Sequence, residues 1–224
     1  MADATTQVLS YALFVAISPI PLIAVVALLA GPSGRRNGVA FLVGWFFGLL
    51  VAGAALVVVL SEPADATDDT TSNPLGWVLL ALAALMLWLA VKQLRQRPKA
   101  GEEPELPSWL AKVDNLNATH SASLAVALSV ANPKNLILLA GAAAAAAETG
   151  ASTEARLEAM LVFALVALIG PAVPVAARLF AGDHAEPMLA RMRAWLARNN
   201  ALILAIICLV IAAKLIADGV GALS

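Results

Sequence analysis

Residues 121–147 read SASLAVALSVANPKNLILLAGAAAAAA, an apolar stretch of 27 residues whose single charge is Lys134. A helix needs about 20 residues to cross the hydrocarbon core of a bilayer, so this stretch is long enough to span a membrane. Asn132 and Pro133 interrupt it near its middle. An N-cap residue followed by proline at the first helical position is a helix-start signal. The stretch therefore predicts two half-helices, the second beginning near the bilayer centre.

The rest of the chain is similarly apolar. Of its 224 residues, 61% are hydrophobic and 13% are charged, with a mean hydropathy of +0.87, whereas soluble domains carry about 25% charged residues. This composition predicts an all-α integral membrane protein with six transmembrane helices. The predicted spans are 8–30, 38–60, 75–91, 121–147, 157–180 and 201–217.

Basic residues gather in alternate loops. Arg35 and Arg36 follow the first span, five basic residues follow the third, and four surround the loop after the fifth. The opposite loops are acidic, with Arg156 as their one basic residue. By the positive-inside rule, the basic loops face the cytoplasm and both termini face the other side.

Two short segments recur along the chain. Ser18-Pro19-Ile20-Pro21-Leu22-Ile23 matches Asn132-Pro133-Lys134-Asn135-Leu136-Ile137 at an offset of 114, and 89–92 matches 211–214 at an offset of 122. Three predicted spans separate each segment from its copy, so the two halves have opposite orientations in the membrane. This is the layout of many secondary transporters. The alternative is chance similarity between helices rich in leucine and alanine.

The repeat predicts the domain organisation. Residues 1–98 form a first three-helix repeat and 119–224 an inverted second one, a 3+3 arrangement with helices 1 and 4 broken at proline. Residues 99–118 form a cytoplasmic linker. Within it, Trp109, Leu110, Val113 and Leu116 recur at helical spacing, which predicts a short helix at the membrane interface. The alternative is an irregular linker.

The predicted breaks indicate a binding site for an anion. The amino end of a helix carries about half a positive charge, and Lys134 adds a full charge close to one of the two ends. Such places attract phosphate, sulfate or carboxylate groups, and intramembrane charges are usually functional. The predicted substrate-binding residues are Ser18, Pro19, Pro21, Asn132, Pro133, Lys134 and Asn135. In the alternative reading, the prolines only kink the helices and Lys134 extends to the interface.

Other chemistries have little support in the residues. No carboxylate lies deep in a span, which argues against a cation cage, and Cys208 is the one cysteine, which excludes an intramolecular disulfide and a cysteine-built metal site. His120 and His184 stand alone. The net charge of −1, without a basic stripe, argues against nucleic-acid binding. We therefore expect no enzymatic activity, no catalytic residue, no metal and no cofactor.

Several segments resemble one transporter family. The segments Ser18-Pro19-Ile20-Pro21 and Phe41-Leu42-Val43-Gly44-Trp45, Trp109 with Asp114, and Asn132-Pro133-Lys134-Asn135-Leu136 are similar to those of the GAP/Sap proteins. These are the peptidoglycolipid- and sulfolipid-addressing proteins of the LysE transporter superfamily. The resemblance covers about residues 8–218. It implies six helices in a 3+3 inverted repeat and export of cell-envelope glycolipids.

These observations predict a multi-pass protein of the cytoplasmic membrane that exports or flips an anionic lipid or glycolipid, with the headgroup bound between the repeats near the midplane. Its expected partners are that lipid and the bilayer. A second copy of the chain and lipid-synthesis or export proteins are further candidates. Two alternatives stay open: an exporter of amino acids or other small organic anions, and a non-transporting scaffold for lipid-synthesis enzymes.

Overall fold

The computed structural model describes residues 2–61, 74–97, 110, 113 and 116–223. Within these ranges the protein is helical and contains no strand, which confirms the all-α class. The elements are α1 (Ala2–Ala16), α2 (Pro19–Ala30), α3 (Gly34–Ser61), α4 (Pro74–Arg95), α5 (Ala118–Val130), α6 (Pro133–Glu148), α7 (Thr153–Ala181), the 3-10 helix η2 (Gly182–Ala185) and α8 (Glu186–Leu223).

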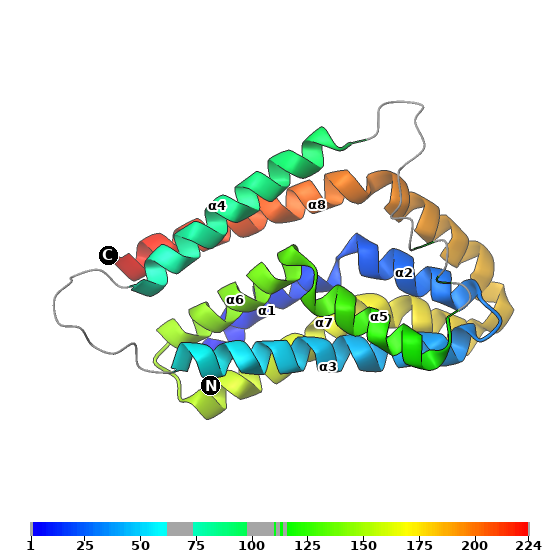
Figure 1. Cartoon of the computed structure of the whole chain (residues 1–224), viewed down its shortest axis with the longest axis horizontal. Coiled ribbons are helices and arrows are strands. Elements are labelled where there is room, and N and C mark those ends of the chain that lie inside the picture. The colour runs from blue at the N-terminus through cyan, green and yellow to red at the C-terminus, as the bar shows by residue number, and fades with distance from the viewer. Residues whose placement is uncertain (1, 62–73, 98–109, 111–112, 114–115, 224) are drawn as a thin grey trace.

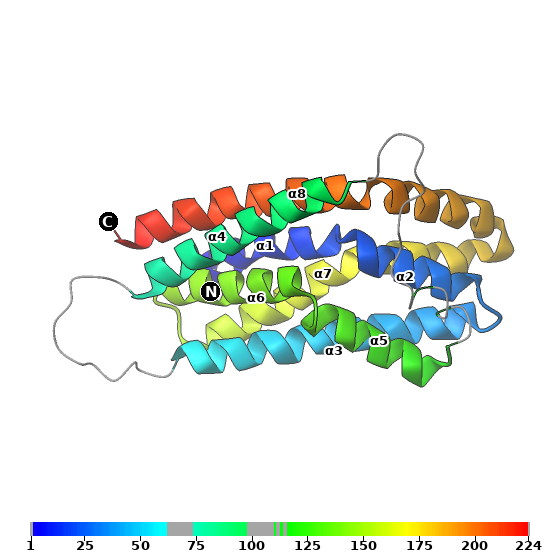
Figure 2. The same ribbon diagram turned by 45° about the horizontal axis from the view of Figure 1, so that its top comes forward.

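The helices form an elongated bundle (Figure 1). The chain termini lie at one end, together with the end of α3, the start of α4 and the turn between α6 and α7 (Figure 2). The opposite end holds the turn between α2 and α3 and the connection between α7 and α8. This end carries Arg35 and Arg36 in the first turn of α3 and Arg178 in the last turn of α7. The basic segments therefore share one end of the molecule.

Several helices are long and apolar enough to cross a membrane. Gly34–Leu60, Gly76–Arg95 and the stretch Thr153–Leu223 meet this criterion, and α1 with α2 and α5 with α6 meet it as pairs bent by 53° and 62°. By length and composition this gives three spans, or up to five when each bent pair counts as one. The stretch Thr153–Leu223 includes both α7 and α8, which run in opposite directions (Figure 1). The chain is thus a membrane protein.

Glycines allow two pairs of helices to pack closely. A Cβ at Gly44 on α3 would overlap the backbone of Ala122 on α5, and a Cβ at Gly170 on α7 would overlap the carbonyl oxygen of Ala16 on α1. Small residues at such crossings let helix backbones approach each other within a membrane. Both contacts join a long helix to the first part of a bent pair.

An aromatic anchor holds α3 against α7. The Trp45 indole is fully buried and its Nε1 donates to the carbonyl oxygen of Ala167 at 3.3 Å. Phe41, one turn earlier, stacks on Trp45 with ring centroids 6.1 Å apart. Because a buried indole N–H needs an acceptor, this bond fixes where the two helices cross.

The predicted interfacial helix falls mostly outside the described residues, as do Trp109 and Asp114. Leu110 and Val113 are described, and both are buried. The Asn37 Nδ2 on α3 donates to the carbonyl oxygen of Leu116 at 2.6 Å. The described part of this linker therefore packs against the end of the bundle that holds the basic segments.

Candidate functional site

Two breaks interrupt the bent pairs, and each is followed by proline. α1 ends at Ala16 and α2 begins at Pro19, while α5 ends at Val130 and α6 begins at Pro133. The second break is capped by Asn132, whose side-chain oxygen accepts from the Lys134 backbone N–H at 3.1 Å. At the first break Ser18 is in the N-cap position but makes no capping bond. Its hydroxyl is buried and has no partner in the described structure.

Lys134 lies in the interior of the bundle. Its side chain is 4% exposed, and Nζ donates to the carbonyl oxygen of Phe14 at 3.0 Å. Phe14 is in the last turn of α1, and its carbonyl would ordinarily accept from the N–H of Ser18. That N–H instead bonds to the carbonyl of Val15. Lys134 therefore satisfies a carbonyl that the first break leaves free.

Asn135 has the corresponding role at the second break. It is fully buried, and its Nδ2 donates to the carbonyl oxygen of Leu128 in the last turn of α5 at 3.2 Å. Its Oδ1 has no partner among the described residues. Two successive side chains at the start of α6 thus cap the ends of both interrupted helices.

The ammonium group of Lys134 contacts the carboxyl end of a helix, whereas the sequence predicts that it lies beside an amino end. The sequence places the charge beside helix amino ends, whereas Nζ contacts the carboxyl end of α1, where the backbone carries partial negative charge. Among the described residues, no carboxylate pairs with Lys134. The carbonyl of Phe14 offsets part of the positive charge of Lys134.

The other predicted site residues differ in their burial. Pro19 and Pro21 are buried on α2, Asn132 is half-buried and Pro133 is exposed. Within the described ranges, no hydrogen bond joins Ser18 to Asn132 or Lys134. Lys134 reaches the first break by its hydrogen bond to Phe14. Asn135 contacts only the second break, by its hydrogen bond to Leu128.

A polar cluster that sequence reasoning missed lies at the end of the bundle with the chain termini. The Tyr11 hydroxyl donates to Asp218 Oδ2 at 2.8 Å, and Lys214 Nζ lies 2.9 Å from the same oxygen. Lys214 also lies 4.9 Å from the centre of the Tyr11 ring. The spacing of Lys214 and Asp218 (i, i+4) is that of a helical ion pair, and this signal was available in the sequence. The cluster joins α1 to α8.

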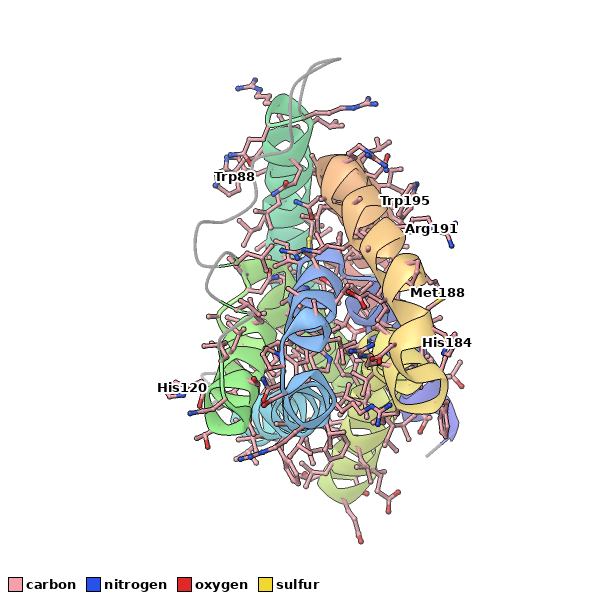
Figure 3. All side chains as sticks on the ribbon, turned by 90° about the vertical axis from the view of Figure 1, so that its right-hand side faces the viewer. Trp88, His120, His184, Met188, Arg191 and Trp195 are labelled. Atoms are coloured by element: carbon pink, nitrogen blue, oxygen red, sulfur yellow. The ribbon has the colours of Figure 1, made fainter. Side chains whose placement is uncertain are left out.

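The described residues offer no site for a metal. No group of three histidine, cysteine or carboxylate side chains there could hold an ion. His120 and His184 lie on the outside of the molecule, on different elements (Figure 3). The polar atoms that could meet a ligand at the breaks are the ammonium of Lys134, the hydroxyl of Ser18 and the amide oxygen of Asn135.

A cavity of about 380 Å³ lies elsewhere, between α2, α7 and α8, and none of the seven predicted site residues lines it. Arg178 and Arg193 line it. The sequence assigned these residues only to the charge of the cytoplasmic loops, because the contact between α2 and α8 that forms the cavity joins residues far apart in the chain.

Comparison with known families gives one match. Residues 8–221 match the family described as "Sap, sulfolipid-1-addressing protein". No curated protein and no solved structure matches the chain.

Proposed function

Because this chain belongs to the Sap, sulfolipid-1-addressing protein, family, we propose that it is a transporter of the cytoplasmic membrane that exports or flips an anionic lipid or glycolipid of the cell envelope. The headgroup binds near the midplane at the two helix breaks. The acyl chains remain in the bilayer, so only the headgroup needs a polar path. The protein acts by binding and moving this lipid and not as an enzyme.

The observation that carries this proposal is the burial of Lys134. An ammonium group that is 4% exposed has one carbonyl partner and no carboxylate partner within the described structure. A charge in the membrane interior is costly, and a phosphate or sulfate group would stabilise it. The unpartnered hydroxyl of Ser18 is a further hydrogen-bond donor at the first break.

Alternating access requires two halves that move against each other, and the packing supports an inverted repeat. The Trp45–Ala167 bond joins α3 to α7 across 122 positions, the same offset at which the sequence of 89–92 matches that of 211–214. A twofold axis would pass through such a contact. The capped carbonyls of Phe14 and Leu128 are likewise 114 positions apart, the offset that relates the two breaks.

Six spans follow when each bent pair is one span and α7 and α8 are counted separately. In this arrangement both termini are extracytoplasmic and the end with Arg35, Arg36 and Arg178 is cytoplasmic. The loop charges support this orientation by the positive-inside rule.

The orientation predicts the labelling of single cysteines in intact cells. In a Cys208→Ala background, we expect a membrane-impermeant thiol reagent to label Glu154→Cys, in the exposed first turn of α7. Ser33→Cys, in the exposed turn between α2 and α3, is expected to react only after the cells are permeabilised. The reverse pattern would contradict the orientation.

Transport itself is tested with the purified chain in vesicles. We expect it to move a fluorescent lipid with a phosphate headgroup between leaflets faster than protein-free vesicles do, and to leave a fluorescent diacylglycerol unaffected relative to that control. Uptake of a free amino acid without lipid movement would instead identify a small-solute exporter. Movement of neither, together with capture of lipid-synthesis enzymes through the basic loops, would identify a scaffold.

A further inference from the structure

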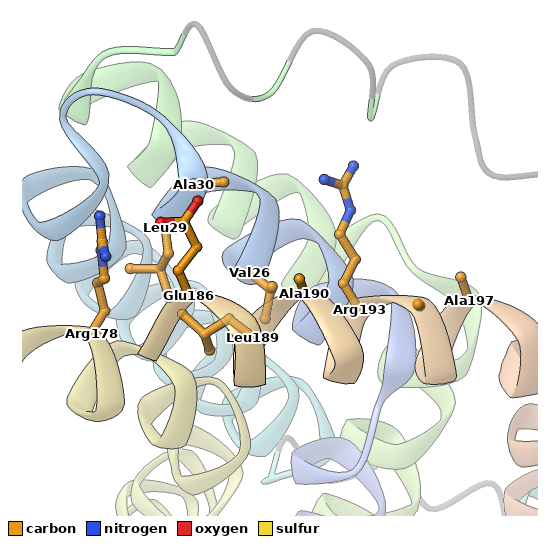
Figure 4. Close-up of a pocket in the computed structure, with 10 residues that line it drawn as sticks. Val26, Leu29, Ala30, Arg178, Glu186, Leu189, Ala190, Arg193 and Ala197 are labelled. Carbon is orange, nitrogen blue, oxygen red and sulfur yellow. The ribbon is translucent and has the colours of Figure 1, made fainter. Parts of the chain in front are cut away.

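The cavity between α2, α7 and α8 opens at the end of the bundle that holds the basic segments. Its walls are the last turns of α2, the end of α7 and the first three turns of α8 (Figure 4). Small-molecule sites have volumes of about 300–1,000 Å³, so a cavity of about 380 Å³ is of this size.

The cavity has an apolar wall and small residues that keep it open. Val26 and Leu29 of α2 form one side, and Leu189 of α8 faces them. Ala190, Ala194 and Ala197 come from the adjoining part of α8. Their short side chains leave space that larger residues would fill. Ala190 and Ala194 are exposed, so the cavity is open to the surroundings of the bundle.

Three charged residues lie at the cavity, and the side chains of two of them have no partner among the described residues. Arg178 is engaged by Asp183, with Nη1 2.9 Å from Oδ1, and by the carbonyl of Gly182. For the side chains of Arg193 and Glu186, the described part of the chain contains no hydrogen-bond or ion-pair partner. Figure 4 shows Glu186 between the two arginines. Within the described structure, the cavity therefore presents one unpaired positive and one unpaired negative side chain.

We propose that this cavity binds a zwitterionic glycerophospholipid of the adjoining leaflet, one whose headgroup carries both a phosphate and a primary amine. Arg193 donates to the phosphate, since the guanidinium group matches phosphate geometry. Glu186 accepts from the ammonium group. A purely anionic headgroup would meet the unpaired carboxylate of Glu186, so the opposite charges favour the zwitterion. The acyl chains lie along Val26, Leu29 and Leu189. This site is separate from the helix breaks and does not depend on transport.

Lipid binding to the delipidated, full-length Lys134→Gln protein in detergent tests the site, because this substitution weakens the separate binding proposed at the helix breaks. Phosphatidylethanolamine, phosphatidylglycerol and diacylglycerol with the same acyl chains are titrated, and bound lipid is counted by native mass spectrometry. We expect phosphatidylethanolamine to bind tightest and diacylglycerol weakest. Arg193→Ala is expected to weaken binding of both phospholipids about tenfold, the effect of losing a hydrogen bond to a charged group. Glu186→Gln is expected to abolish the preference for phosphatidylethanolamine over phosphatidylglycerol.

Arg191 provides the matched control. It is exposed on the outer face of the same helix, two positions from Arg193, and its Nε donates to the carbonyl of Pro187 (Figure 3). Arg191→Ala removes the same charge and is expected to leave lipid binding unchanged. Ala190→Phe is expected to abolish binding by filling the cavity. Equal binding of diacylglycerol, equal effects of Arg191→Ala and Arg193→Ala, or full binding to Ala190→Phe would each overturn the proposal.

Discussion

Lys134→Gln is expected to reduce the movement of a phosphate-bearing lipid in vesicles by about tenfold or more, because a hydrogen bond to a charged group contributes about 1.5–3 kcal/mol and 1.4 kcal/mol corresponds to tenfold. Glutamine retains an N–H donor for the carbonyl of Phe14, which Lys134 now satisfies at 3.0 Å. The substitution therefore removes the charge while preserving a donor for the free carbonyl of Phe14 at the end of α1.

Other substitutions of Lys134 are expected to differ in their transport activity. Lys134→Arg is expected to retain partial transport, since the charge remains and the shape of the group changes. Lys134→Glu is expected to be inactive, because a carboxylate would repel an anionic headgroup at the break. Lys134→Ala is also expected to be inactive, but it leaves the Phe14 carbonyl unsatisfied, at a cost of about 1–3 kcal/mol. Thermal unfolding of each variant separates this destabilisation from loss of transport.

Lys92 is the control for these variants. It is exposed near the end of α4, with Nζ 5.2 Å from the centre of the Trp88 ring. Lys92→Gln removes a lysine charge outside the proposed site and is expected to transport at the rate of the unchanged protein. Normal transport by Lys134→Gln or Lys134→Glu would exclude the anion-binding mechanism.

Gly170→Ala is expected to destabilise the fold. The added Cβ would overlap the carbonyl oxygen of Ala16, and neither backbone can move without separating α7 from α1. Overpacking of this kind costs about 1–3 kcal/mol, occasionally more. Thermal unfolding of the purified protein in detergent is expected to show a clearly lower midpoint.

Gly221 provides the comparison for Gly170. It lies near the end of α8, and a Cβ there meets no atom within 4 Å. Gly221→Ala is expected to leave the unfolding midpoint unchanged or slightly raised, because alanine has the higher helix propensity. If Gly170→Ala unfolded at the same temperature as Gly221→Ala, the close approach of α7 to the first break would be wrong.

The sequence was sufficient for the fold class and the family. The apolar composition predicts an all-α membrane protein, and the motifs around Pro19, Trp45 and Pro133 predict the family that residues 8–221 match. These features follow from composition and from local patterns in the chain. They do not require knowledge of which helices touch.

The contacts of the site needed the structure, because they join distant residues. Lys134 and Phe14 are 120 positions apart, and no periodicity relates a lysine to one particular backbone carbonyl. The cavity arises where α2 meets the start of α8, so Arg193 and Glu186 look in the sequence like ordinary loop charges. The Tyr11–Asp218 bond joins residues 207 positions apart, although the neighbouring pair of Lys214 and Asp218 was visible from its helical spacing.

The central claim is that an anionic headgroup passes between the two helix breaks at Lys134. An experimental map of the full-length protein, reconstituted with a lipid that carries a phosphate or sulfate headgroup, tests it most directly. The account predicts headgroup density within hydrogen-bonding distance of Lys134 Nζ, with the chains extending toward the bilayer. Headgroup density found only in the cavity beside Arg193, with Lys134 still enclosed by apolar side chains and bonded to Phe14 alone, would contradict it.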